Sequence, residues 1–128
     1  MSEAIDNQYA AEAAERWPEQ FAESNRRFGA LGADQQREVL AKHGDITARL
    51  GALFQAGETV ESDAVQAVIQ DHYRWITNFW TPNQAAYRGL GEMYASDERF
   101  AANYESVAVG LADFMRRAMS LYASANLG

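Results

Sequence analysis

Apolar residues recur at intervals of three and four along most of this 128-residue chain, and proline interrupts the pattern only at Pro18 and Pro82. This spacing places apolar side chains on one face of an α-helix. The strict alternation of apolar and polar residues that marks a half-buried strand is absent. The sequence therefore predicts an all-α fold, and its length fits a single domain over residues 1–128.

Breaks and caps divide the pattern into separate helices. Trp17 and Pro18 separate the first two, because the residue before a proline avoids the helical region and proline fits the first turn of a helix. Ser62 and Ser96 are expected N-caps, since a serine hydroxyl can accept a hydrogen bond from a free backbone N–H of the first turn. The fourth helix is expected to be the most buried. The expected helical ranges are 6–16, 18 to about 31, 34–56, 63–79, 84–95, 97–105 and 106–125.

The chain carries 18 acidic and 11 basic residues, a net charge of −7, and it has no cysteine. An acidic chain without a basic run is a poor binder of nucleic acid or anionic membranes, so no such partner is expected. The lack of cysteine removes disulfides, thiolate nucleophiles and thiolate metal ligands. No early apolar run resembles a signal peptide or a membrane span, so a cytoplasmic location is expected, and a monomer is favoured.

Both histidines of the chain, His43 and His72, lie on apolar helix faces. Three interpretations stay open for His72: a core residue with a hydrogen-bond partner, a ligand contact, or a haem ligand. Asp71 and His72 do not form a pair of metal ligands, because adjacent helical residues point about 100° apart. No nucleophile–base pair, phosphate loop or metal-spaced cluster appears, so neither an enzyme nor a cofactor or metal is expected. Three carboxylates fit helix ends and caps: Glu92, Asp97 and Glu98.

Aromatic residues are numerous, with three tryptophans, six tyrosines and six phenylalanines. Core packing is the default use of each ring. The weakly apolar N-terminal segment nevertheless ends in Trp17, which indicates a flap over an apolar cleft. We therefore expect residues 1–31 to form the flap and residues 34–126 to form the core. Such a cleft is the usual form of a small-molecule site.

Several motifs together resemble the TipAS-type antibiotic-recognition domain, the ligand-binding domain of TipA-like regulators of the MerR family. The resemblance extends from about Tyr9 to Tyr122. Its most specific part is the run from Leu90 to Tyr94. The motifs that carry it are Trp17 with Phe21 and Ser24, Asp71-His72, Leu90-Gly91-Glu92-Met93-Tyr94, Asp97-Glu98-Arg99-Phe100, Tyr104, Gly110-Leu111-Ala112 and Ala118.

The resemblance implies a globin-like helical bundle without haem, whose N-terminal helices form a mobile flap over the cleft. It also implies non-covalent binding or sequestration of bulky heterocyclic peptide antibiotics such as thiopeptides. The role would be that of a standalone resistance protein or of the effector-sensing domain of a transcription regulator. Because the chain begins with Met1 and leaves no room for a DNA-binding domain, the standalone form is expected. The expected ligand-binding residues are Trp17, Phe21, Ser24, His72, Ile76, Trp80, Tyr87, Tyr94 and Phe100, with Ser24 and His72 supplying hydrogen bonds.

The chain departs from the family pattern in two places. Pro18 stands where the family has a glycine after the tryptophan, which makes the hinge stiffer. Some members trap dehydroalanine groups through a cysteine between their fourth and fifth helices, and a chain without cysteine cannot do so. Two alternatives from other functional classes stay open: a helical module that binds a partner helix through an apolar stripe, and a cofactor-binding relative of the globins.

Overall fold

The computed structural model describes residues 15–128, which form six helices and, within that range, no strand. The all-α prediction is confirmed. Most of the expected helix over residues 6–16 lies outside the described residues. The helices are α2 (Pro18–Gly29), α3 (Ala33–Gln55), α4 (Asp63–Ile76), α5 (Gln84–Ser96), α6 (Glu98–Glu105) and α7 (Leu111–Asn126).

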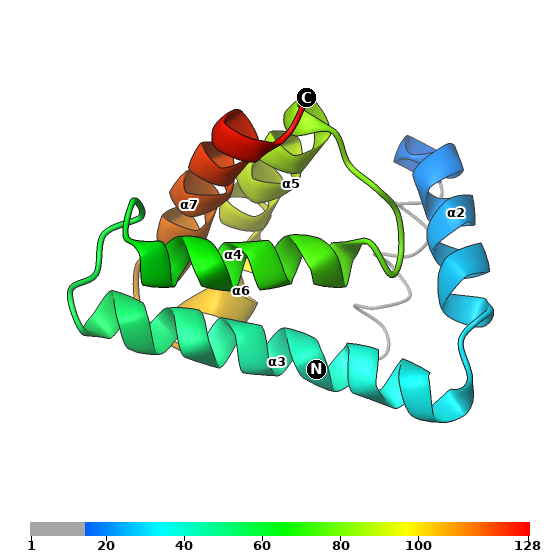
Figure 1. Ribbon diagram of the computed structural model, residues 1–128, viewed down its shortest axis with the longest axis horizontal. Coiled ribbons are helices and arrows are strands. Elements are labelled where there is room, and N and C mark those ends of the chain that lie inside the picture. The colour runs from blue at the N-terminus through cyan, green and yellow to red at the C-terminus, as the bar shows by residue number, and fades with distance from the viewer. Residues whose placement is uncertain (1–14) are drawn as a thin grey trace.

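The helices α3 to α7 pack into one body, with α5 beside α7 and α3 beside α4 (Figure 1). Helix α4 also packs on α7, so the two pairs share one apolar core. Helix α2 stands at the edge of this body, and none of its residues is buried. The largest apolar side chains that are completely buried in the core are Ile46, Leu50, Ile69, Tyr87, Tyr104, Leu111, Met115 and Met119.

Helix α2 is attached to the body near its C-terminal end. The Arg27 guanidinium donates hydrogen bonds to the Thr77 carbonyl oxygen (3.1 Å) and to the Thr81 hydroxyl (2.9 Å). The Phe28 ring stacks on Phe79 with 5.6 Å between ring centroids. These contacts join α2 to the turn that follows α4, and they leave the N-terminal half of α2 facing α5.

Helix α4 ends at Ile76, and the prediction that it continues to Phe79 is wrong. The N–H groups of Phe79 and Trp80 both donate to the Ile76 carbonyl oxygen, at 2.9 and 3.1 Å. A tightened turn of this kind satisfies carbonyl groups at a helix end. It turns Phe79 toward α2 and brings Trp80 to the start of α5.

The predicted N-cap at Ser96 is wrong, because Asp97 caps α6. The Asp97 carboxylate accepts from the Arg99 backbone N–H (3.0 Å) and also pairs with the Arg99 guanidinium (2.7 Å). These hydrogen bonds hold the pKa of Asp97 below its ordinary value. The Ser96 hydroxyl instead donates to the Glu92 carbonyl inside α5. An aspartate carboxylate has two acceptor oxygens and a negative charge, so it can cap the helix and form an ion pair with Arg99, whereas a serine hydroxyl carries no charge.

Helix α7 begins at Leu111, five residues after its predicted start. Gly110 adopts φ +93°, a left-handed conformation that ends the preceding turn. The Glu105 carboxylate accepts hydrogen bonds from the backbone N–H groups of Gly110 (2.9 Å) and Ala112 (3.0 Å). The first turn of α7 is therefore capped by a side chain from the preceding helix, which no local pattern reveals.

Helix α3 begins at Ala33, one residue before its expected start at residue 34, and Gly32 takes the N-cap position. The prediction that α4 is the most buried helix is also wrong. Helix α7 buries eight of its 16 residues and α4 five of its 14. The reason is that α7 packs against α3, α4, α5 and α6, whereas part of α4 borders a surface hollow.

Candidate functional site

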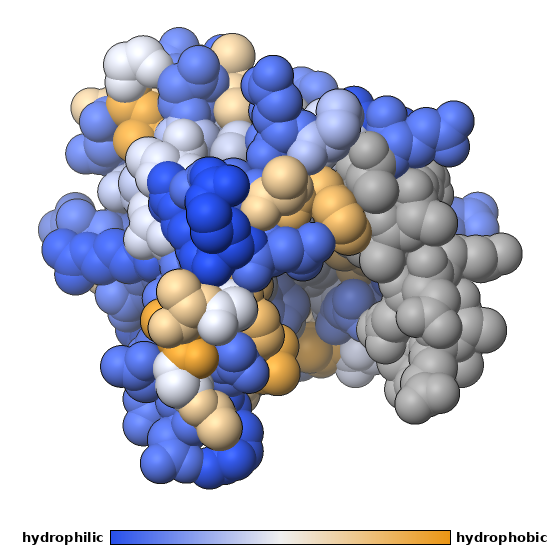
Figure 2. Space-filling view, turned by 90° about the vertical axis from the view of Figure 1, so that its right-hand side faces the viewer, coloured by the Kyte–Doolittle hydropathy of each residue, from blue (hydrophilic) through white to orange (hydrophobic). Residues whose placement is uncertain are grey.

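A cavity of about 550 Å³ lies between the N-terminal half of α2 and one face of α5, and we call it the α2–α5 cavity. Its volume lies within the usual range for small-molecule sites. Figure 2 shows the face of the molecule on which α2 lies, where apolar residues border a hollow in a mostly hydrophilic surface. The lining residues are Trp17, Gln20, Phe21, Ser24 and Asn25 on one wall, and Trp80, Ala86, Gly89, Leu90 and Met93 on the other.

The α2 wall forms because Trp17, Gln20, Phe21 and Ser24 are spaced by three and four residues and so share one face of a helix. Pro18 occupies the first position of α2, where its missing N–H does no harm. Trp17 takes the N-cap position with an extended φ of −134°. The result is a helix face that carries rings and uncharged polar groups together.

The described residues that line the α2–α5 cavity are uncharged. Among the described residues that border it, none is ionisable, although the chain has 29 acidic and basic residues. Its polar side chains, Gln20, Ser24 and Asn25, all come from α2. Amide side chains offer both donors and acceptors. Because a buried charge without a partner is strongly unfavourable, this lining favours an uncharged ligand with amide-like polar groups.

Four of the nine predicted ligand-binding residues border the α2–α5 cavity: Trp17, Phe21, Ser24 and Trp80. The structure places the other five in the core or packed against it. His72 and Tyr87 have no exposed surface, Ile76 and Tyr94 are 5% and 6% exposed, and Phe100 packs against the core. A ligand contact by any of the nine residues stays a prediction.

Sequence reasoning missed six of the lining residues, four of them on α5. Ala86, Gly89, Leu90 and Met93 follow a helical spacing that the sequence displays. The larger rings of Tyr87 and Tyr94, on the neighbouring face of the same helix, were the more obvious candidates for ligand contacts. The other two, Gln20 and Asn25, flank the aromatic stripe of α2.

His72 forms hydrogen bonds through both ring nitrogens. Its Nδ1 lies 2.7 Å from the Tyr87 hydroxyl and its Nε2 lies 3.5 Å from the Tyr94 hydroxyl. Complete burial, with a smaller effect of nearby His43, lowers the pKa of His72 to about 3. The ring is therefore neutral at pH 7. Because both nitrogens already have partners in the core, the geometry favours a structural role over ligation of a haem iron.

His43 extends this group of polar rings toward the surface. Its Nε2 lies 3.2 Å from the Tyr104 hydroxyl, and its ring packs on Trp75 at 4.9 Å between centroids. Burial lowers the pKa of His43 as well. We call His43, His72, Tyr87, Tyr94 and Tyr104 the histidine–tyrosine cluster. It joins α3, α4, α5 and α6 beneath the walls of the cavity.

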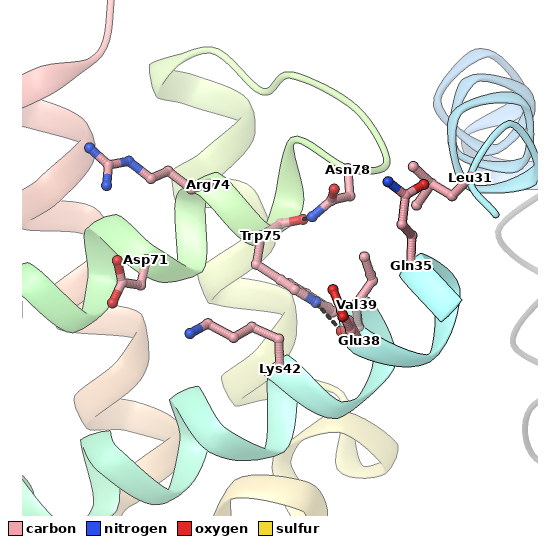
Figure 3. Close-up of a pocket in the computed structure, with 9 residues that line it drawn as sticks. All are labelled: Leu31, Gln35, Glu38, Val39, Lys42, Asp71, Arg74, Trp75 and Asn78. Carbon is pink, nitrogen blue, oxygen red and sulfur yellow. Dashed lines mark hydrogen bonds between the residues drawn. The ribbon is translucent and has the colours of Figure 1, made fainter. Parts of the chain in front are cut away.

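A second hollow, of about 470 Å³, lies between α3 and α4, and we call it the α3–α4 hollow (Figure 3). Its border carries both charge signs: Glu38 and Asp71, Lys42 and Arg74. Several of its polar groups already have partners. The Trp75 indole N–H donates to the Val39 carbonyl (2.7 Å), and Asp71 pairs with Arg49 (3.0 Å). The less polar α2–α5 cavity is therefore the better candidate site.

Within residues 15–128, no group of three or more histidine, aspartate or glutamate side chains is arranged to hold a metal ion. None of the described helices combines the length and apolar character that crossing a membrane requires.

Residues 9–122 match the family model described as the TipAS antibiotic-recognition domain. The chain is 31% identical over 116 residues to the HTH-type transcriptional activator TipA of Streptomyces coelicolor (strain ATCC BAA-471 / A3(2) / M145), which covers 88% of this chain and 46% of that protein. It is also 31% identical over 116 residues to the HTH-type transcriptional activator mta of Bacillus subtilis (strain 168), covering 89% and 44%. The chain thus spans less than half the length of these regulators.

Among solved structures, the chain is similar to TipAS from the thiopeptide antibiotic multidrug resistance system of Streptomyces lividans, in complex with nosiheptide. The TM-score is 0.81 at 30% sequence identity, and the match covers 93% of this chain and 85% of that chain. The two proteins therefore share their helical fold.

Proposed function

This chain belongs to the TipAS antibiotic-recognition domain family, and we propose that it binds bulky, uncharged heterocyclic peptide antibiotics of the thiopeptide type in the α2–α5 cavity. Family membership makes the chain a ligand-recognition domain and not an enzyme. The observation that carries the proposal is the cavity lining, which combines aromatic rings, small apolar residues and amide groups, with no ionisable side chain among the described residues.

The lining suits the chemistry of a peptide built from planar heterocycles. Trp17, Phe21 and Trp80 offer ring faces and edges for stacking. Gln20 and Asn25 offer donors and acceptors that match the amide links between heterocycles. Binding is non-covalent, because a chain without cysteine has no thiolate to add to the ligand. The relative TipAS was solved with nosiheptide, which makes that thiopeptide the first ligand to test.

We also propose that α2 moves as the flap of the site. Two observations support this motion. Helix α2 has no buried residue, and its attachments to the rest of the structure, Arg27 and Phe28, lie at its C-terminal end. Few apolar contacts make local opening inexpensive in free energy. Closure would press the α2 wall onto a ligand lying on α5. The bound antibiotic is then sequestered, or it is sensed where the domain is joined to a DNA-binding segment.

The proposal is tested by titrating the protein with nosiheptide while following tryptophan fluorescence. Since Trp17 and Trp80 line the cavity, we expect a saturable one-to-one change in emission and a rise in melting temperature. Denaturing mass spectrometry should return the unmodified protein mass. A multiply charged aminoglycoside serves as the control and should give no response, because the described lining of the cavity carries no counter-charge. Failure of nosiheptide and other thiopeptides to bind would refute the proposed function.

A further inference from the structure

Gly89 lies inside α5 at a position where glycine is unfavourable. A glycine in a helix interior costs about 1 kcal/mol relative to alanine. At nearby Gly91 the glycine is explained by packing, because a Cβ there would lie 3.4 Å from the Arg116 Cα and from the Met119 side chain. At Gly89 a Cβ would meet no atom of the described residues within 4 Å. Helix packing therefore does not account for Gly89.

The cavity gives Gly89 a different role. Gly89 borders the α2–α5 cavity between Ala86 and Leu90, on the wall opposite Trp17 and Phe21. Without a side chain at this position, the backbone of α5 itself forms the cavity surface. A Cβ at this position would meet no described atom within 4 Å, so a side chain of any other residue would occupy space that glycine leaves open.

We propose that Gly89 is a specificity-determining residue, which lets a planar ring system lie flat against the α5 backbone beneath the rings of α2. This inference rests on the proposed function and narrows the ligand class to uncharged molecules with an extended planar heterocycle. Gly89 acts by leaving space: the ring faces of Trp17 and Phe21 stack on one side of the ligand, and α5 supports the other.

The test compares two glycines that differ only in their relation to the cavity. Gly44 is also an exposed, helical glycine whose Cβ would meet nothing within 4 Å, but it lies in α3 and does not border the cavity. Gly89→Leu should weaken nosiheptide binding about tenfold or more, since a pocket commonly discriminates by that much for a single added methylene. Gly44→Leu should bind as wild type does. Both variants should melt at or above the wild-type temperature, because each replaces a helical glycine.

Binding is measured by the fluorescence titration, and folding by far-UV circular dichroism. Gly89→Ala is the second variant if Gly89→Leu folds poorly, and it should show a smaller loss in the same direction. Wild-type affinity in both Gly89 variants would overturn the role of Gly89 and leave the proposed function intact. If wild-type protein binds no thiopeptide, the proposed function fails and this inference fails with it.

Discussion

Replacing Trp17 with alanine is expected to weaken nosiheptide binding about thirtyfold and to leave the melting temperature of the free protein almost unchanged. Trp17 borders the α2–α5 cavity, and it lies outside the packed core. Removal of a large ring from the centre of a binding contact commonly costs about 2 kcal/mol or more, which is roughly thirtyfold in affinity. The melting temperature of the ligand-free protein should stay almost unchanged because none of the residues of α2 is buried.

Leu40→Ala is the matched control for this prediction. Leu40 is a large apolar side chain that is 63% exposed on α3 and does not border the cavity. Its removal should change neither binding nor melting temperature. Affinity equal to that of wild type in Trp17→Ala would show that the α2 wall is not part of the site.

The largest effect on stability is expected from His72→Ala, with a loss of about 3–5 kcal/mol at pH 7. The substitution removes a fully buried ring and leaves a cavity in the core. It also removes the ring nitrogen that lies 2.7 Å from the buried Tyr87 hydroxyl. Urea unfolding followed by circular dichroism measures the loss. A cost below about 1 kcal/mol, the level of an ordinary surface substitution, would contradict the central position of His72.

The effect of His72→Ala should also depend on pH. His72 has an ordinary pKa of 6.5 in the unfolded chain and about 3 in the folded protein. The stabilisation that requires its neutral form is complete above pH 6.5 and decreases as the pH falls toward 3, because the unfolded chain binds the proton. The stability difference between wild type and variant should therefore shrink by about 1.4 kcal/mol for each pH unit below 6.5.

The difference in unfolding free energy between wild type and His72→Ala isolates the titration of one histidine. His43 and the carboxylates with lowered pKa, such as Asp97 and Asp113, titrate in both proteins and largely cancel in the difference. If His72→Ala is too unstable to measure, His72→Gln provides a milder variant without the titrating ring. A difference that stays constant from pH 7 to pH 4 would mean that His72 is not held neutral by burial.

The sequence predicts the parts of this fold that depend on local physics. Helix α2 starts at Pro18 and α4 is capped by Ser62, as expected, because proline and serine act on the backbone within one turn. The start of α7 depends instead on Glu105, a residue of α6 whose carboxylate accepts from the backbone N–H groups of Gly110 and Ala112. Such interactions leave no periodic signal.

The candidate site likewise has one wall that the sequence predicts and one wall that it does not. The α2 wall follows from a single aromatic stripe, and the sequence indicates it directly. Helix α5 has two faces of apolar and aromatic residues, and periodicity does not say which one is buried. In the structure the face with Tyr87 and Tyr94 turns inward to His72, while Ala86, Leu90 and Met93 border the cavity. That choice depends on how α5 packs on α6 and α7.

The location of the ligand is tested most directly by the indole N–H signals of the three tryptophans in a ¹H–¹⁵N NMR spectrum. Trp17 and Trp80 border the α2–α5 cavity, whereas Trp75 borders the α3–α4 hollow and donates to the Val39 carbonyl. On addition of nosiheptide, the signals of Trp17 and Trp80 should shift to saturation at one equivalent, while the signal of Trp75 stays in place. A shift of Trp75 alone would put the ligand in the α3–α4 hollow and contradict the proposed site.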